Sequence, residues 1–215
     1  MAAAEQVWTI VVGGGSGRRF GTAKQYELLG EVRVIDRSVA VARVVSAGVV
    51  IVVPPEDADA EGAVAGGATR SESVRAGLAA VPSDATIICV HDAARPLASV
   101  ALYRRAIDAV SEGADAAIPA VSVADTIKVV ADGVVVATPD RASLVAVQTP
   151  QAFRAGVLRE AHAAGGDATD DAALVEGRGG LVVVVDGETT NRKITVPDDL
   201  VWARGRLADV GEGWS

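Results

Sequence analysis

The chain contains little of several residue types, and each shortage excludes a class of protein. Its one cysteine, Cys89, cannot form a disulfide within the chain, which excludes a disulfide-rich fold. That cysteine and the two histidines, His91 and His162, form no cluster with the spacing of a structural zinc site. Aromatic residues make up 3% of the chain, so a core must consist mainly of Val, Ala, Ile and Leu. No apolar run approaches the roughly 20 residues that span a bilayer, so we expect no membrane helix.

Basic charge is also scarce. The chain has 20 Lys and Arg against 28 Asp and Glu, which gives a formal net charge of −8. An acidic chain is not attracted nonspecifically to nucleic acid or to an anionic membrane, so we expect neither as a partner. An anionic substrate would have to meet a local group of cations. Residues 1–6 lack the basic and apolar regions of a signal peptide, and we therefore expect a cytoplasmic protein.

Short β-branched runs alternate with segments of helical periodicity. The pattern predicts five strands, at Val7–Val12, Gly48–Pro54, Thr86–His91, Ala114–Val121 and Leu181–Asp186. Between them it predicts helices at Asp36–Ala47, Ser71–Val81, Ser99–Glu112 and Phe153–Ala164. We therefore predict an α/β fold with a doubly wound, mostly parallel sheet. The length of 215 residues fits a single domain, 1–215.

One segment breaks the alternation. Two short apolar runs, Thr126–Ala131 and Val134–Ala137, are joined by Asp132-Gly133, a dipeptide typical of two-residue hairpin turns. A hairpin inserted late in a parallel α/β domain often projects from it. We therefore expect an arm at about residues 122–148.

The first candidate site is a glycine-rich loop after the first strand, Gly13–Phe20, followed by Lys24. Glycines let backbone N–H groups approach phosphate oxygens, and Arg18, Arg19 and Lys24 supply the charge that a triphosphate needs. A tight turn with solvated arginines is the alternative. The Walker pattern is absent, and a dinucleotide fingerprint fails because Phe20 stands where its third glycine belongs.

The second candidate site follows the third strand, in His91–Pro96. Asp92 and Arg95 lie at a strand's carboxyl end, where open α/β sheets bind ligands, and they could hold a ribose, a metal-bound phosphate or an anion. They could also pair with each other.

Two further segments before predicted helices carry polar residues. In Gly66–Ser73, the pair Gly66-Gly67 lets the backbone contact a flat base. Ser71 is expected to cap the helix, and Ser73 is either a ligand or ordinary helix surface. In Thr169–Asp171 the two acids belong either to a site or to a helix N-cap. His162, on a predicted helix, is expected at the surface.

Taken in order, these motifs resemble those of the 2-C-methyl-D-erythritol 4-phosphate cytidylyltransferases. The similarity extends over about Val7 to Leu207 and rests on an ordered series of motifs: Arg18-Arg19-Phe20 with Lys24-Gln25-Tyr26, Gly66-Gly67 with Arg70 and Ser73-Val74, Val90–Pro96, Asp125–Lys128, Asp140-Arg141, Gln148–Phe153, Thr169–Ala172, Asn191–Thr195 and Pro197–Leu200.

The resemblance implies a Rossmann-like enzyme that joins magnesium-bound CTP to a polyol phosphate and releases pyrophosphate. It also implies a homodimer whose arm completes the partner's site. By motif, Arg19, Lys24, Lys193 and Arg141 would be catalytic, and Asp92 the nearest carboxylate to the metal. CTP would contact Gly13, Gly14, Gly15, Gly17, Gly67, Ser73 and Asp92. The polyol phosphate would contact Arg95, Asp125, Thr126, Arg141, Thr169 and Lys193.

Three features depart from the family. Its loop usually begins Pro-Ala-Ala-Gly, whereas this chain has Val12-Gly13-Gly14-Gly15, and Arg192 stands where an apolar residue is usual. The loop between Phe20 and Lys24 is also short, which could shift Lys24 slightly. Arg192 could alter the substrate pocket or form a salt bridge. The alternatives are a ribitol 5-phosphate or other sugar-phosphate nucleotidyltransferase, and a noncatalytic nucleotide-binding homologue.

Overall fold

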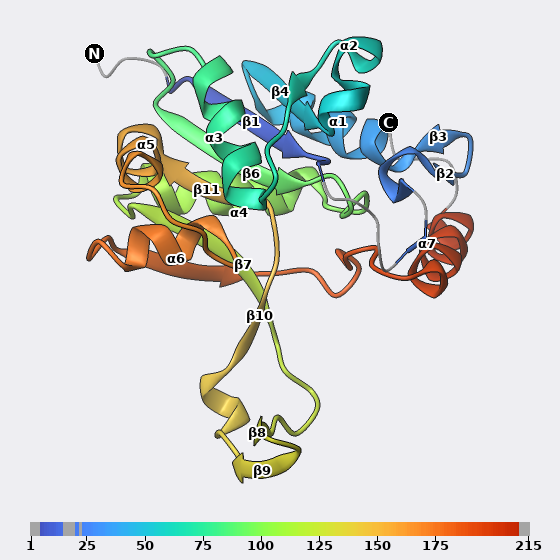
Figure 1. Cartoon of the computed structure of the whole chain (residues 1–215), viewed down its shortest axis with the longest axis vertical. Coiled ribbons are helices and arrows are strands. Elements are labelled where there is room, and N and C mark those ends of the chain that lie inside the picture. Colours follow the sequence, from blue (N-terminus) through green and yellow to red (C-terminus); the bar gives the residue numbers. More distant parts are fainter. Residues whose placement is uncertain (1–4, 15–19, 22, 211–215) are drawn as a thin grey trace.

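A computed structural model of the chain describes residues 5–14, 20–21 and 23–210 (Figure 1). Its central sheet has the spatial order β12-β7-β11-β6-β1-β4-β5. β10 and β11 pair with the same edge of β7, β11 with its first residues and β10 with its last residues. The strands are β1 Val7–Val12, β4 Gly48–Val53, β5 Val64–Ala65, β6 Ile87–Asp92, β7 Ala116–Ser122, β10 Val145–Val147, β11 Gln151–Arg154 and β12 Val182–Asp186.

The sheet is mostly parallel. β10 and β11 are antiparallel to their neighbours, and the other pairs in this sheet are parallel. The core strand β6 is buried along its whole length, as expected for a strand covered on both faces. The predicted doubly wound, mostly parallel α/β fold is confirmed.

Helices cover both faces of the sheet. α1 (Val34–Val45) and α4 (Val100–Ser111) pack on one face, around Val11 and Cys89. α3 (Arg70–Ala80), α5 (Ala155–Ala163) and α6 (Asp171–Glu176) pack on the other, around Ile10 and Ile88. Aliphatic side chains dominate both layers, as the composition predicts.

A smaller apolar cluster lies beside the sheet, where α7 (Pro197–Val210) packs near the hairpin of β2 (Leu28–Leu29) and β3 (Val32–Arg33). The remaining short elements are α2 (Ala58–Glu61) and the 3₁₀ turns η1 (Lys24–Tyr26), η2 (Pro55–Asp57) and η3 (Arg141–Ser143).

The N-terminus of α3 differs from the prediction. Thr69, not Ser71, caps the helix: its hydroxyl accepts from the N–H of Glu72, whose side chain reaches back to the Thr69 N–H. The sequence Thr-x-x-Glu encodes this capping box. Ser71 is therefore inside the first turn, where its hydroxyl accepts from the N–H of Ala168.

A hairpin of β8 (Val129–Ala131) and β9 (Val134–Ala137) projects from the body between β7 and β10 (Figure 1). Asp132 and Gly133 at its tip have φ values of 48° and 78°, which suit a two-residue turn. We call residues 123–144 the arm. Its exposed apolar side chains include Ile127, Val129, Val130, Val134, Val135 and Val136.

Candidate active site

The candidate site lies at the carboxyl ends of β1 and β6, where the strand order reverses. After β1 the chain places β4 and β5 on one side and then β6 on the other. Val12 and Asp92, which end the two strands, are register partners. Ligands of open α/β sheets bind at such a point.

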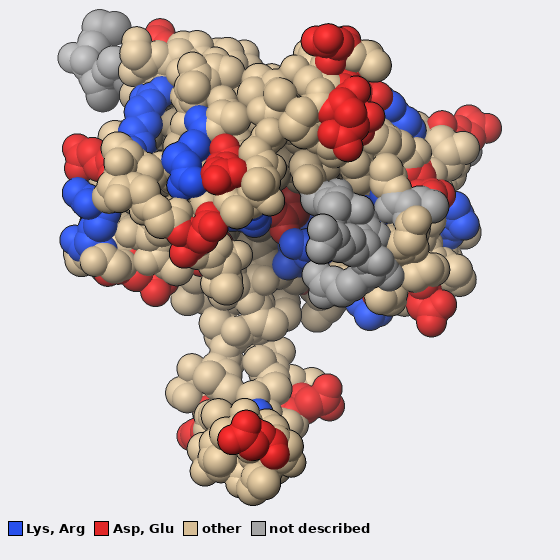
Figure 2. All heavy atoms as spheres, viewed as in Figure 1, with Lys and Arg blue, Asp and Glu red and all other residues tan. Residues whose placement is uncertain are grey.

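A cleft of about 300 Å³ lies beside Asp92. In the space-filling view, acidic and basic side chains meet in a hollow above the root of the arm (Figure 2). The lining residues are Arg70, Asp92, Arg95, Val147, Gln148, Thr149, Gln151, Thr169, Asp170 and Lys193.

Asp92 holds two cations at the cleft. Its Oδ2 accepts from Lys193 Nζ at 2.6 Å, and its Oδ1 accepts from Arg70 Nε at 3.3 Å. Burial alone would raise the pKa of Asp92, but the charges of Lys193 and Arg70 outweigh it and hold the pKa below its usual range. The carboxylate is therefore ionised and fixes both cations in place.

Arg95 does not pair with Asp92, the alternative that the sequence left open. Its guanidinium donates to the carbonyl oxygens of Asn191 at 2.8 Å and Val147 at 3.3 Å. Burial lowers the pKa of Arg95, which still remains cationic. Within the described ranges it makes no salt bridge, so its charge is available to an anion in the cleft.

Ser73 joins the two glycine segments and is not ordinary helix surface. It is 2% exposed, accepts from the N–H of Gly67 at 3.2 Å and donates to the Thr69 carbonyl. A Cβ on Gly14 would lie 3.2 Å from Ser73 Oγ, and one on Gly66 only 2.8 Å. Glycine therefore lets these backbone segments approach Ser73 closely.

Part of the predicted phosphate loop, namely Gly15, Gly17 and Arg19, lies outside the described residues. Gly13 follows β1, and its N–H donates to the Val52 carbonyl. Lys24, half-buried at the start of η1, is not among the residues that line the cleft.

The predicted residues of the arm are not at the cleft of their own chain. Asp125, Thr126 and Arg141 are exposed on the arm, which leads away from the body (Figure 1). Arg141 Nη1 donates to the Ala124 carbonyl at 2.8 Å. Thr126 and Arg141 could contact such a cleft only if it belonged to a second copy of the chain.

The segment Thr169–Asp171 provides the helix N-cap that the sequence offered as one alternative, and part of it also lines the cleft. Thr169 is exposed at the cleft. Asp170 caps α6 by accepting from the N–H of Ala173, and it also accepts from Gln151 Nε2 at 2.8 Å. Asp171 is fully buried and accepts from Arg70 Nη1 at 2.7 Å.

The prediction of a surface histidine at position 162 is wrong. His162 is 3% exposed, and its Nε2 lies 3.0 Å from Asp171 Oδ1. The buried face of α5 includes Ala155, Leu158 and His162, at the i, i+3, i+7 spacing of an amphipathic helix. The same spacing in the sequence could have placed His162 inside.

Arg192 is directed toward α7. Its guanidinium lies 4.6 Å from the ring centroid of Trp202 and forms an ion pair of 3.7 Å with Asp199. Arg192 thus forms a salt bridge, one of the two alternatives stated above, while its neighbour Lys193 faces Asp92.

Sequence reasoning gave no role to several residues of the site. Arg70 joins two carboxylates, and its signal was a cation shortly after a glycine pair and before a helix. Gln148, Gln151 and Asn191 lie on irregular or polar segments. Asn191 donates to the Thr149 carbonyl at 2.9 Å and so connects the segment that carries Lys193 to the link between β10 and β11.

Two carboxylates of the cleft could contact a magnesium ion carried by the phosphates of a substrate. Among the described residues no three His, Cys, Asp or Glu side chains are grouped to hold a metal. Asp92 and Asp170 are the carboxylates that line the cleft. Magnesium is commonly held by one or two carboxylates and by substrate phosphates, which matches this arrangement.

The arrangement suits stabilisation of an anion more than proton transfer. Arg70, Arg95 and Lys193 surround the cleft, whereas burial lowers the pKa of the neighbouring His91 to about 4. Fixed cations in a partly buried cleft stabilise the charge of a phosphoryl transition state.

None of the helices among the described residues has the length and the apolar character of a membrane span.

Residues 7–208 match the family described as IspD, 2-C-methyl-D-erythritol 4-phosphate cytidylyltransferase. The chain is 44% identical over 96% of its length to a bifunctional enzyme IspD/IspF of Anaeromyxobacter dehalogenans, of which it covers 58%. It is 39% identical over 96% of its length to a 2-C-methyl-D-erythritol 4-phosphate cytidylyltransferase of Syntrophotalea carbinolica, of which it covers 98%. The 4-diphosphocytidyl-2C-methyl-D-erythritol synthase of Anaerococcus prevotii superposes with a TM-score of 0.83 at 28% identity, over 96% of this chain and all of that one.

Proposed function

Since the chain belongs to the family of 2-C-methyl-D-erythritol 4-phosphate cytidylyltransferases, we propose that it transfers the cytidylyl group of CTP to 2-C-methyl-D-erythritol 4-phosphate. The observation that carries the proposal is the group of cations, Lys193, Arg70 and Arg95, around Asp92 at the strand-order reversal. The chain spans a little over half the length of the bifunctional relative, so the proposal concerns this chain's own site.

In the proposed reaction a phosphate oxygen of the polyol attacks the α-phosphorus of CTP. A bond forms between that oxygen and phosphorus, and the bond from the α-phosphorus to the β-phosphate oxygen breaks. Pyrophosphate leaves with the electron pair. Because the nucleophile is already an anion, the site must position charges and needs no general base.

Each predicted residue has a place in this proposal. Arg19 and Lys24 stabilise the charge that develops at the α-phosphorus. Gly13, whose N–H is bonded to the Val52 carbonyl, begins the loop in which Gly14, Gly15 and Gly17 hold the triphosphate. Gly67 and Ser73 support the nucleoside. Lys193, Arg95 and Thr169 hold the polyol phosphate, which is consistent with the place of these three at the cleft.

Magnesium belongs to the proposal as an ion carried by CTP. When bound, it neutralises charge on the triphosphate. Asp92 is the protein carboxylate that would contact it, and the same carboxylate orients Lys193 and Arg70.

The proposal includes a homodimer in which the arm of one chain reaches the cleft of the other. The apolar side chains exposed on the arm support this, since a second chain would remove them from water. Most of the visible surface of the arm is uncharged (Figure 2). Asp125, Thr126 and Arg141 would then bind the partner's polyol phosphate.

The proposal also includes a cytoplasmic location, which is consistent with a single buried cysteine.

The test pairs CTP, UTP, ATP and GTP with methylerythritol phosphate, ribitol 5-phosphate and glycerol phosphate, and measures pyrophosphate release. We expect release with CTP and methylerythritol phosphate. Release with ribitol 5-phosphate instead would assign the alternative substrate, and no release with any pair would indicate a noncatalytic homologue.

Lys193 and its neighbour Arg192 allow a test of the Lys193 assignment with a matched control variant. Lys193→Ala should lower kcat/KM about a hundredfold, the typical effect of removing one charge-stabilising contact. Arg192→Ala removes the same charge one residue earlier but lies on Trp202, so it should leave kcat/KM within about threefold. Equal losses in the two variants would contradict the assignment of Lys193.

A further inference from the structure

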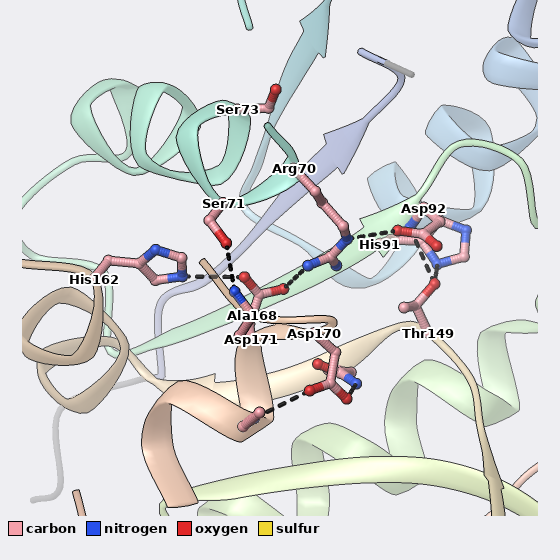
Figure 3. A network of polar contacts seen from close by, with 12 residues as sticks. Arg70, Ser71, Ser73, His91, Asp92, Thr149, His162, Ala168, Asp170 and Asp171 are labelled. Carbon is pink, nitrogen blue, oxygen red and sulfur yellow. Dashed lines mark hydrogen bonds and ion pairs between the residues drawn. The ribbon is translucent and has the colours of Figure 1, made fainter. Parts of the chain in front are cut away.

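A network of ion pairs and hydrogen bonds runs from the cleft into the interior, and Figure 3 shows its part from Asp92 through Arg70 and Asp171 to His162. Lys193 pairs with Asp92, Asp92 with Arg70, and Arg70 with Asp171, whose second oxygen accepts from His162. The five residues come from the segment before α7, the end of β6, the start of α3, the start of α6 and α5. Arg70 is the link between the cleft and the interior, because its Nε and Nη1 bind two different carboxylates.

The inner end of this network is fully enclosed. Asp171 and His162 are 0% and 3% exposed, and neither lines the cleft. Within the described residues the His162 ring makes one hydrogen bond, to Asp171, and its buried Nδ1 has no partner. The only hydrogen bond of this imidazole among the described residues is therefore the one to Asp171 Oδ1.

Packing alone does not require a histidine here. The neighbouring apolar cluster on this face of the sheet includes Leu158, Ala161 and Val175, so an aliphatic side chain at position 162 would extend it. Exchanging a buried polar pair for apolar residues is often neutral for stability, whereas removing one partner leaves a buried group unsatisfied. An aliphatic side chain could not fix the orientation of the Asp171 carboxylate.

We propose that His162 and Asp171 are positioning residues for the cations of the cleft. His162 holds Asp171 in one orientation, and Asp171 then fixes Nη1 of Arg70. With Nη1 held, Nε of Arg70 stays on Asp92 Oδ1, and Oδ2 remains turned to Lys193. Sites of this kind need their groups held to within about half an ångström, so a support outside the cleft affects the reaction. The kinetic consequences rest on the cytidylyl transfer proposed above.

The kinetic test compares three variants of α5 in the full chain. His162→Leu removes the donor to Asp171 and should lower kcat about tenfold, with the KM for CTP changed less than about threefold. His162→Gln keeps an N–H donor near the position of Nε2 and should restore kcat to within about twofold of wild type. Leu158→Ala, in the same helix and fully buried, is the control for lost stability and should leave kcat per folded molecule near wild type.

Two kinetic results would overturn the proposal. One is a kcat for His162→Leu no lower than that of Leu158→Ala, and the other is a His162→Gln variant as impaired as His162→Leu. If His162→Leu does not fold, Asp171→Asn, which removes the charge that faces Arg70, takes its place in the same comparison.

Crystal structures of His162→Leu and Asp171→Asn provide a readout that does not depend on the reaction. We expect Arg70 Nε to leave Asp92 in both. An intact Arg70–Asp92 contact in both variants would overturn the proposal whatever the kinetics. A wild-type protein that forms no product would refute the proposed function, and the two structures would still decide whether His162 and Asp171 position Arg70.

Discussion

His91 should make the stability of the fold depend on pH between about 6.5 and 4. The ring is fully buried, with Nε2 3.2 Å from the Arg95 carbonyl and Nδ1 3.2 Å from Thr149 Oγ1. Since a carbonyl only accepts, Nε2 carries the proton and Nδ1 accepts from the Thr149 hydroxyl, which itself accepts from the N–H of Asp92. A second proton, on Nδ1, would end the hydrogen bond that the Thr149 hydroxyl donates and would place a charge in a fully buried position.

The magnitude follows from the pKa. Burial, aided by the charge of Arg95, lowers the pKa of His91 from 6.5 to about 4 against the opposing effect of Asp92. Between these values the unfolded chain binds a proton that the folded chain does not, so stability is lost as the pH falls through this window. The loss from this residue is about 2 kcal/mol at pH 5 and approaches about 3 kcal/mol at pH 4. Protonation of Asp92 in the unfolded chain adds to the loss only below about pH 4.

Urea denaturation at pH 7.5, 6 and 5, followed by tryptophan fluorescence, measures the effect in wild type and in His91→Gln. Glutamine cannot titrate. Between pH 7.5 and 5, the free energy of unfolding of His91→Gln should therefore fall by about 2 kcal/mol less than that of wild type. Equal losses in the two proteins, or an NMR titration of His91 with a midpoint near 6.5, would refute the reasoning.

Three further predictions concern the site. Lys24→Ala should lower kcat about a hundredfold and change the KM for CTP far less, because the cation acts on charge that develops in the transition state; a normal kcat with weakened CTP binding would make Lys24 a ground-state contact instead. Chelation should abolish activity but leave the circular dichroism spectrum unchanged, and added magnesium should restore turnover; unfolding on chelation would contradict an ion that travels with CTP. Refolding Lys24→Ala and Arg141→Ala chains together should form about half heterodimers, each with one intact site, and restore up to about a quarter of wild-type activity. Activity that stays at the level of the separate mutants, with heterodimers confirmed by mass, would contradict a site shared between two chains.

Much of the sheet could be predicted from local patterns. β1 has the predicted bounds because its β-branched run ends at glycines, and the predicted strand at Gly48–Pro54 exceeds β4 by one residue. β10 and β11 were missed because the segment Val145–Arg154 is interrupted by Gln-Thr-Pro-Gln. The insertion of β11 between β6 and β7 depends on tertiary pairing, which no local pattern specifies.

The candidate site was predictable in its residues but not in its connections. Asp92 and Lys193 were identified from their motifs, yet they are 101 positions apart, and nothing local indicates that they pair. Arg192 and Lys193 lie outside any helix or strand, so no periodicity predicts which of them faces the cleft. The surface assignment of His162 failed for another reason, because the spacing with Ala155 and Leu158 is visible in the sequence and places position 162 on the apolar side of the helix.

The most direct test of the central claim follows two labels of CTP in the presence of 2-C-methyl-D-erythritol 4-phosphate. With the label on the α-phosphorus, the account predicts that radioactivity appears in the CDP-alcohol. With the label on the γ-phosphorus, it predicts radioactivity in pyrophosphate, and neither transfer should occur without the polyol phosphate. Transfer of the γ-label to the polyol, or release of the α-label as CMP without any CDP-alcohol, would contradict cytidylyl transfer.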